Sequence, residues 1–173
     1  MNRTLITACF LVLSAGPLLS QGGDEQRLKA AFVFRFPQFV TWPPASTTGR
    51  NTVEICVTAA PATADALRDL TSGESLNGRP FVVRENPSVQ SLGSCHVLMV
   101  TARPDRAVMA RAAALPILTV GDSETFLDDG GIIQLRLVDR RVRFEISLPA
   151  AARAGITLSS QLLRLAAGVR GGQ

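Results

Sequence analysis

Short apolar segments alternate with helical segments over residues 53–120, and this alternation constrains the fold more than any other feature of the chain. The most apolar segment, Val97-Leu-Met-Val100, contains no polar residue, which is typical of a strand covered on both faces. Pro61 and Pro104 each begin a segment with helical spacing. The pattern predicts a three-layer α/β domain, a mostly parallel sheet with helices on both faces. The predicted strands are 53–57, 81–83, 97–100 and 117–120.

The chain on either side of this region follows different patterns. Residues 24–40 carry apolar side chains at helical spacing, and Pro37 within them is expected to kink the helix. After residue 120, Asp122 or Ser123 is expected to cap a short helix that ends near Gly130. Further helices are predicted over 150–154 and 158–169.

Residues 133–146 predict a β-hairpin. Apolar and polar residues alternate on both sides of Asp139-Arg140, which suits a tight turn. One apolar and one polar face indicate an antiparallel ribbon at the edge of the sheet, exposed to water on one side. The fold class is therefore a single α/β domain with a C-terminal antiparallel edge hairpin.

The first residues indicate an export signal. Arg3 precedes the apolar run 5–13, and Ser20-Gln21-Gly22 offers a cleavage site, which assigns 1–22 to the signal peptide and 23–173 to the mature domain. Cleavage after Gly16 is less suitable because Pro17 follows it. The run is short for a membrane anchor, and Cys9 lies inside the run, too early for the cysteine of a lipoprotein. Export through the cytoplasmic membrane to the periplasm is the resulting prediction.

Charge and cysteine content narrow the class of protein. The net charge of +4 comes from arginines scattered along the chain, and there is no tyrosine, so the basic face with stacking aromatics of a nucleic-acid binder is not indicated. After loss of Cys9, Cys56 and Cys95 remain. An even pair in an oxidising compartment indicates a disulfide; the alternative is two buried thiols on adjacent strands.

Catalytic and metal-binding patterns are missing from the sequence. Cys95 and His96 are neighbours on a predicted strand and point to opposite faces, so they do not form a dyad. His96 is the only histidine, which argues against a zinc site. The strand ends lack a phosphate-binding glycine loop, and Asp128-Asp129 and Ser159-Ser160 suit turns and helix caps. We therefore assign no catalytic residue, metal or cofactor.

The remaining candidates are surface residues that could bind a protein partner. The polar face of the predicted hairpin presents Arg136, Arg143 and Glu145, which would suit ion pairing or strand addition. The simpler alternative is that these charges protect a sheet edge from aggregation. Phe34 and Arg35 lie off the main apolar stripe of the first helix and are further candidates, although Phe34 could instead pack beneath a loop.

Several segments resemble the YfiR-like family of bacterial periplasmic proteins. The resemblance covers Lys29 to Ala166, and its pieces occur in the family's order behind an export signal. They are Lys29-Ala-Ala-Phe-Val-Phe-Arg-Phe with Phe39-Val-Thr-Trp-Pro43, Leu118-Thr-Val-Gly-Asp122, Phe126, Gly130-Gly-Ile-Ile133, Arg143-Phe-Glu-Ile146 and Ser159-Ser-Gln-Leu-Leu163.

The resemblance implies a non-enzymatic periplasmic regulator. The family's namesake binds the periplasmic sensory domain of an inner-membrane diguanylate cyclase and represses it, which limits cyclic-di-GMP and biofilm growth. Other members are expected to serve sensor kinases, and members tend to self-associate, so a homo-oligomer is expected here. Cys56 and Cys95 match a cysteine pair that resembles the family's structural disulfide. A second pair, which some relatives carry near the end of the domain, is missing here. Pro37 stands where the family usually has a small or polar residue in the first helix.

A second hypothesis is a small-molecule-binding module that reports to a receptor. In open α/β sheets, ligands bind beyond the carboxyl ends of the strands. Those ends lie near Thr58, Thr101 and Gly121 in the predicted sheet.

Overall fold

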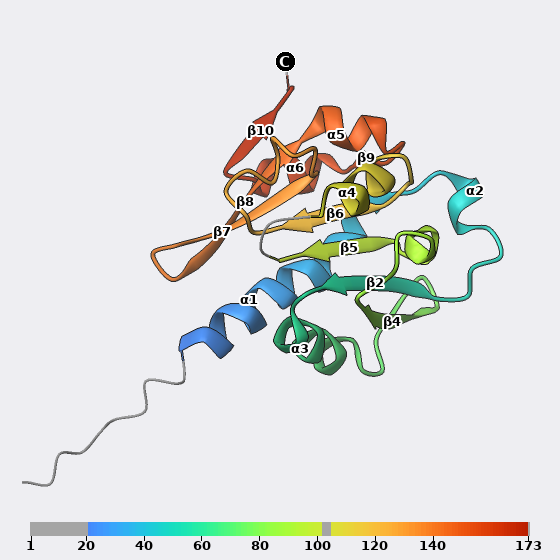
Figure 1. Ribbon diagram of the computed structural model, residues 1–173, viewed down its shortest axis with the longest axis horizontal. Coiled ribbons are helices and arrows are strands. Elements are labelled where there is room, and N and C mark those ends of the chain that lie inside the picture. The colour runs from blue at the N-terminus through green and yellow to red at the C-terminus, as the bar shows by residue number, and fades with distance from the viewer. Residues whose placement is uncertain (1–20, 102–104, 173) are drawn as a thin grey trace, which may run out of the picture.

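A mixed sheet forms the middle layer of the molecule, which confirms the predicted fold class (Figure 1). The structure is a computed structural model and describes residues 21–101 and 105–172; residues 1–20 of the predicted signal peptide lie outside them. Within the described residues, eight strands lie side by side in the order β10 (Gly168–Arg170), β8 (Arg141–Ser147), β7 (Ile133–Val138), β6 (Leu118–Gly121), β5 (Val97–Val100), β2 (Val53–Thr58), β4 (Arg79–Glu85) and β3 (Ser75–Leu76).

Most neighbouring strands run parallel. The exceptions are the two hairpins, β3–β4 and β7–β8, whose strands pair antiparallel. The β3–β4 turn consists of Asn77 and Gly78, both with positive φ, as an Asn-Gly pair at a tight turn predicts. The helices are α1 (Gln21–Arg35), α2 (Pro44–Thr47), α3 (Pro61–Thr71), α4 (Arg106–Ala113), α5 (Leu148–Arg153) and α6 (Ser160–Leu165), with 3₁₀ turns η1 (Phe36–Phe39) and η2 (Ser91–Ser94).

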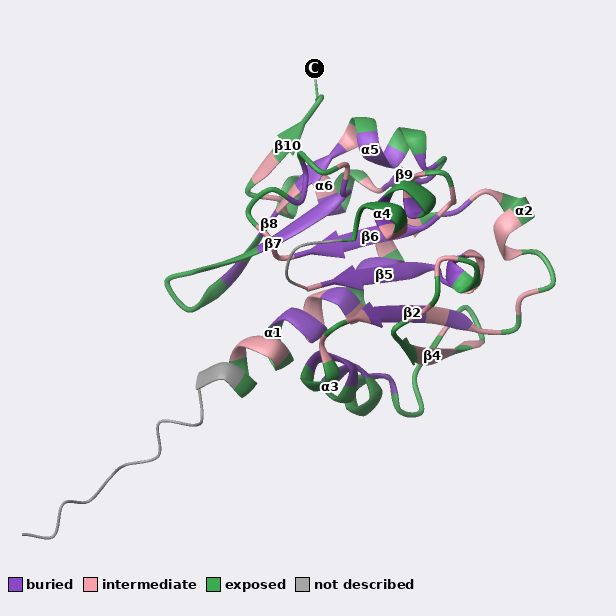
Figure 2. Ribbon diagram, viewed as in Figure 1, coloured by how far each residue is buried: buried purple, intermediate pink, exposed green. Residues whose placement is uncertain are grey.

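Alternate residues of the central strands serve two separate cores, one on each face of the sheet. On one face Ile55, Val97 and Met99 pack with residues of α1, α3, α5 and α6. On the other face Cys56 and Leu98 pack with residues of η2 and α4. The central strands are accordingly buried along their length (Figure 2). This arrangement confirms that helices cover both faces, because a strand presents successive side chains to opposite sides.

The first helix is shorter than its apolar pattern predicts. The α-helix ends at Arg35, and Pro37 lies in the first turn of η1, which leads into the short strand β1 (Val40–Thr41). Proline lacks the backbone N–H that an α-helix needs at this point and is tolerated in the first turn of a new helical segment. Pro37 therefore ends the α-helix instead of kinking it. β1 pairs with β9 (Thr157–Leu158) in a separate two-stranded sheet.

The predicted helix after residue 121 is wrong. Residues 124–130 form successive turns around the fully buried ring of Phe126. A Cβ on Gly121 would lie 2.3 Å from this ring, and one on Gly131 would lie 2.2 Å from it. Glycine is required at both positions because the ring lies directly against the backbone.

The end of the chain also differs from the prediction. The helix predicted over 158–169 is confined to α6, and the chain then extends as β10, which pairs in parallel with the last residues of β8. β10 therefore takes the outermost place in the sheet, next to the predicted hairpin. None of the helices formed by the described residues is both long and apolar enough to span a bilayer.

A candidate protein-interaction surface

The β7–β8 hairpin extends beyond the body of the domain (Figure 1). Its base is held between β6, which pairs with Ile133 and Gln134, and β10, which pairs from Glu145 onward. Asp139 and Arg140 form the turn with φ of 50° and 60°, which fits the two-residue turn that the sequence predicts. The outer half of the ribbon is exposed (Figure 2) and includes Leu137 and Val138, with 41% and 45% of their surface accessible.

The polar face of this hairpin brings three of the predicted partner-binding residues together. Arg136 lies directly opposite Arg143 in the strand register. One guanidinium nitrogen of Arg136 lies 3.8 Å from a carboxylate oxygen of Glu145. Arg143 forms no ion pair with any residue that the structure describes. The face thus carries a net positive charge and has donors free to bind an anionic group.

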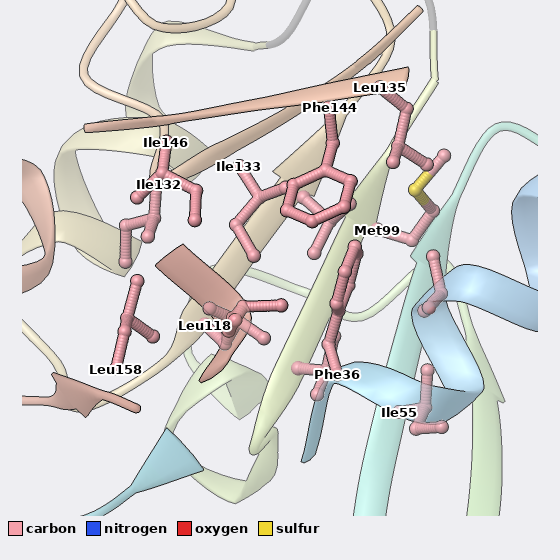
Figure 3. Packing of buried hydrophobic residues seen from close by; sticks show 14 of the residues in the cluster. Phe36, Ile55, Met99, Leu118, Ile132, Ile133, Leu135, Phe144, Ile146 and Leu158 are labelled. Carbon is pink, nitrogen blue, oxygen red and sulfur yellow. The ribbon is translucent and has the colours of Figure 1, made fainter. Parts of the chain in front are cut away.

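An apolar groove lies on the opposite side of β8, where three distant parts of the chain meet. It has a volume of about 250 Å³. Phe36 and Phe144 form its floor, with ring centroids 5.4 Å apart in an edge-to-face contact (Figure 3). Leu165 at its rim is 63% exposed. The residues that line it are Ala31, Phe32, Arg35, Phe36, Phe39, Phe144, Leu162 and Leu165, which we call the Phe36 groove.

The two predicted residues of the first helix lie in different environments. Arg35 is exposed and is the one charged residue that lines the Phe36 groove. Phe34 instead packs edge-on against Phe81 of β4, with ring centroids 5.3 Å apart, and the Arg35 guanidinium lies 5.2 Å from its ring centroid. Phe34 is thus packed, as the alternative expected, but against strand β4 and not beneath a loop. The predicted set does not form one continuous surface.

The Phe36 groove was not predicted from the sequence. Its walls come from α1 and η1, from β8 and from α6, and the sequence contains no signal that these segments meet. The one available hint was the density of leucines near the end of the chain: Leu162, Leu163 and Leu165 are too closely spaced for one face of so short a helix to bury all three.

The predicted disulfide is present in the structure. Cys56 and Cys95 are bonded, with their Cα atoms 5.8 Å apart, and both side chains are buried. His96 follows Cys95 in the chain. Its Nδ1 accepts a hydrogen bond from the backbone N–H of Glu54 at 3.1 Å. Burial, reinforced by the charges of Arg50 and Arg79, lowers the pKa of His96 to about 4. His96 is therefore neutral near pH 7.

The predicted ligand crevice at the carboxyl ends of the strands is covered where β6 ends. Asp122 follows β6 directly, and its carboxylate binds the Lys29 ammonium of α1 at 2.7 Å. Lys29 also binds Glu25 at 2.6 Å, and the lysine is only 6% exposed. Thr58 and Thr101 form hydrogen bonds to backbone carbonyls of neighbouring strands. Asp122 thus anchors α1 instead of capping a helix.

The described part of the chain contains no cluster of metal-ligating side chains. Among residues 21–101 and 105–172, no group of three or more His, Cys, Asp or Glu side chains is placed to hold an ion.

Comparison with known proteins identifies one family. The family model described as YfiR/HmsC-like matches residues 26–167, most of the chain. The comparison with curated proteins found no match.

Among solved structures, the fold is similar to that of a conserved domain protein from Vibrio cholerae O1 biovar eltor str. N16961. The TM-score is 0.54 with 12% sequence identity, and the match covers 84% of this chain. The chain spans 60% of the length of that protein. At this identity the likeness concerns the fold.

Proposed function

This chain belongs to the YfiR/HmsC-like family, and from that membership we propose that it is a non-enzymatic periplasmic regulator of an inner-membrane signalling protein. The family is periplasmic, regulatory and non-catalytic. The partner proposed here is the periplasmic sensory domain of a diguanylate cyclase, which the protein binds and represses, so that cyclic-di-GMP falls while the complex persists. The family match over residues 26–167 is the observation that carries this proposal.

The proposed location follows from the beginning of the chain. Residues 1–22 have the order of a cleaved export signal, with a basic residue, an apolar run and a small-residue cleavage site. Cleavage after Gly22 would remove the first two residues of α1 and leave Lys29 and its carboxylate partners in place. Mass spectrometry of the protein from a periplasmic extract tests this: an N-terminus near residue 23 supports export, and an intact N-terminus argues against it.

The Phe36 groove is the surface that we propose for the partner. Its lining is apolar except for Arg35, and Leu165 exposes a large apolar side chain at the rim. Exposed apolar patches of this kind are typical of interaction sites. An amphipathic segment of the partner fits best, with apolar side chains in the groove and an acidic side chain that pairs with Arg35. The Arg136–Arg143 face lies on the other side of β8 and would contact a second acidic region.

Capture from solubilised membranes tests this assignment. The wild-type protein is expected to retain a membrane signalling protein, and Leu165→Asp is expected to lose it, because a charge in an apolar contact is strongly unfavourable. Leu165 is 63% exposed, so this change leaves the fold intact. Arg111→Glu on the far face, in α4, is the matched control and is expected to retain the partner. Equal capture by Leu165→Asp and wild type would exclude the groove.

Charge reversal at Arg136 and Arg143 tests the contribution of the hairpin to partner binding independently of the Phe36 groove. Arg136→Glu with Arg143→Glu is expected to weaken capture while the circular dichroism spectrum stays unchanged. Unchanged capture would leave both arginines with the role of guarding an exposed ribbon.

Self-association is also proposed, on the ground of family membership. Analytical ultracentrifugation of the mature protein is expected to show a dimer or larger species at micromolar concentration. A single monomeric species would contradict it.

The alternative of a small-molecule module receives less support at the carboxyl ends of the parallel strands. The carboxyl end of β6 is covered by the Lys29–Asp122 pair. A different pocket, at the opposite end of the sheet, has the features of a ligand site.

A further inference from the structure

A pocket of about 280 Å³ opens at the end of the sheet where the parallel strands begin. Arg50 precedes β2, Cys95 and His96 precede β5, and residues 115–117 precede β6; all of them line the pocket. The short helix α2, at the same end of the molecule (Figure 1), contributes Ala45 and Ser46. The pocket is thus separate from the Phe36 groove, with no residue in common.

His96 lines this pocket, is tied to Glu54 by two hydrogen bonds, and has one unused donor. Its backbone N–H donates to Glu54 O at 2.9 Å, and its Nδ1 accepts from the Glu54 N–H at 3.1 Å. A neutral imidazole with an accepting Nδ1 carries its proton on Nε2. This Nε2 is buried and has no hydrogen-bond partner in the described chain, and a buried donor without an acceptor costs about 1–3 kcal/mol.

Trp42 lies beside His96 and shares this property. The two rings meet edge-on with centroids 5.7 Å apart. The indole Nε1 is likewise buried without an acceptor among the described residues. An N–H group that points at an aromatic ring gains only a fraction of the stabilisation of a normal hydrogen bond. The region therefore has an excess of donors.

Arg50 adds a positive charge to the same pocket. Its guanidinium donates to the carbonyls of Ser94 at 2.7 Å and Gly93 at 2.5 Å, which fixes it at the rim and leaves further N–H groups for a ligand. None of the described residues that line the pocket is acidic. The nearby Glu54 carboxylate is already bound by Arg84 at 2.7 Å.

From this geometry we propose that the pocket binds a small organic monocarboxylate with an apolar body. Its carboxylate oxygens accept hydrogen bonds from the Arg50 guanidinium and, once the side chains that cover it move aside, from the buried His96 Nε2–H. Pro116 and Ile117 form an apolar wall for the remainder of the ligand. The volume is at the lower limit of ordinary ligand pockets, about 300 Å³, which restricts the ligand to a small molecule.

The chain has a built-in reporter for this site, because Trp42 is the only tryptophan and there is no tyrosine. Isovalerate is a suitable probe, with isovaleramide as its uncharged isostere. Isovalerate is expected to change the Trp42 fluorescence and the single indole ¹H–¹⁵N signal in a saturable way, and isovaleramide is not. No saturable change with isovalerate, or an equal response to the amide, would overturn the proposal.

Three variants sharpen the test. Arg50→Met is expected to weaken isovalerate binding at least about tenfold, the effect of losing one charge-assisted hydrogen bond. His96→Asn keeps an acceptor for the Glu54 N–H but removes the Nε2 donor, and is expected to weaken binding as well. Arg111→Met, in α4, is the matched control with unchanged affinity. Wild-type affinity in Arg50→Met, with the circular dichroism spectrum unchanged, would overturn the site. This outcome is independent of whether a membrane partner is found.

Discussion

At the scale of single residues, Lys29 shows how one charged side chain fixes an element. Its ammonium lies between Asp122 and Glu25, at 2.7 and 2.6 Å, and its side chain is 8% exposed. Burial by itself lowers the pKa of Lys29, but the hydrogen bonds to Asp122 and Glu25 outweigh it, so the pKa lies above its ordinary value. The charged form is therefore favoured by folding, and its contribution is lost only above about pH 10.5.

Removing this charge is expected to destabilise the fold. Lys29→Met keeps the length of the side chain but leaves Asp122 with an uncompensated charge, which is expected to lower the free energy of unfolding by about 2–4 kcal/mol. Arg27→Met on the same helix is the control. Its ion pair with Asp69 spans 3.9 Å with both side chains 74% exposed, and the expected change is under about 0.5 kcal/mol. Equal urea midpoints for the two variants would contradict this role of Lys29.

His96 predicts a pH dependence of stability. Its pKa is lowered by burial to about 4 in the folded protein, against about 6.5 in the unfolded chain. Between these values the unfolded state binds the proton and the folded state does not, so stability falls as pH decreases from 6.5 to 4. The loss reaches about 3 kcal/mol at most.

The measurement compares wild type with His96→Asn. Carboxylates such as Glu54, which pairs with Arg84, also titrate in acid, so only the difference between the two proteins isolates the histidine. Urea unfolding at pH 7 and pH 4.5 is expected to show a smaller acid loss in His96→Asn. Identical losses would mean that His96 does not stay neutral when folded.

At the scale of elements, the disulfide connects β2 to the residue that precedes β5 by two positions. Cys56 and Cys95 are separated by 39 residues. Closing a loop of that length stabilises the fold by roughly 4 kcal/mol in the chain-entropy model. The bond lies within the core between the sheet and α4.

The double variant Cys56→Ala/Cys95→Ala is expected to lose a few kcal/mol of stability and to retain the fold. Thiol titration of native, unreduced mature protein is expected to find no free thiol. Two reactive thiols would contradict the bond. Wild-type protein under reducing conditions should approach the stability of the double variant.

The sequence predicted those elements whose pattern depends on local rules. The apolar run of β5 and the Asp139-Arg140 turn were predicted correctly because each follows from burial or turn chemistry within a few residues. The segment after Asp122 was predicted as a helix, but residues 124–130 form turns. Here the Phe126 ring packs directly against the backbone of Gly121 and Gly131, which leaves no room for a side chain at either position. That contact is tertiary and leaves no periodic signal.

At the scale of the whole molecule, the candidate surface was the least predictable part. Arg136, Arg143 and Glu145 were correctly placed on one face because strand alternation determines their side. The sequence did not predict where these three residues lie relative to Arg35 and Phe34, because that depends on how α1 packs across the sheet. The Phe36 groove depends on contacts between residues as distant as Phe36 and Phe144.

The architecture of the whole domain suits regulation by docking to a partner. Two separate cores pack against the sheet, one on each face, and the residues proposed for contact lie outside them or at their margin. A partner that binds the Phe36 groove would contact α1, β8 and α6 together. Such a surface exists only in the folded domain, so unfolding and loss of repression are expected to coincide.

Cellular cyclic-di-GMP, measured with and without this gene in matched cultures, tests the central claim most directly. Deletion is expected to raise cyclic-di-GMP, because the cyclase loses its repressor. Restoring the wild-type gene should return the level to normal, whereas the Leu165→Asp gene should not. An unchanged level on deletion would contradict the proposal that this protein represses a diguanylate cyclase.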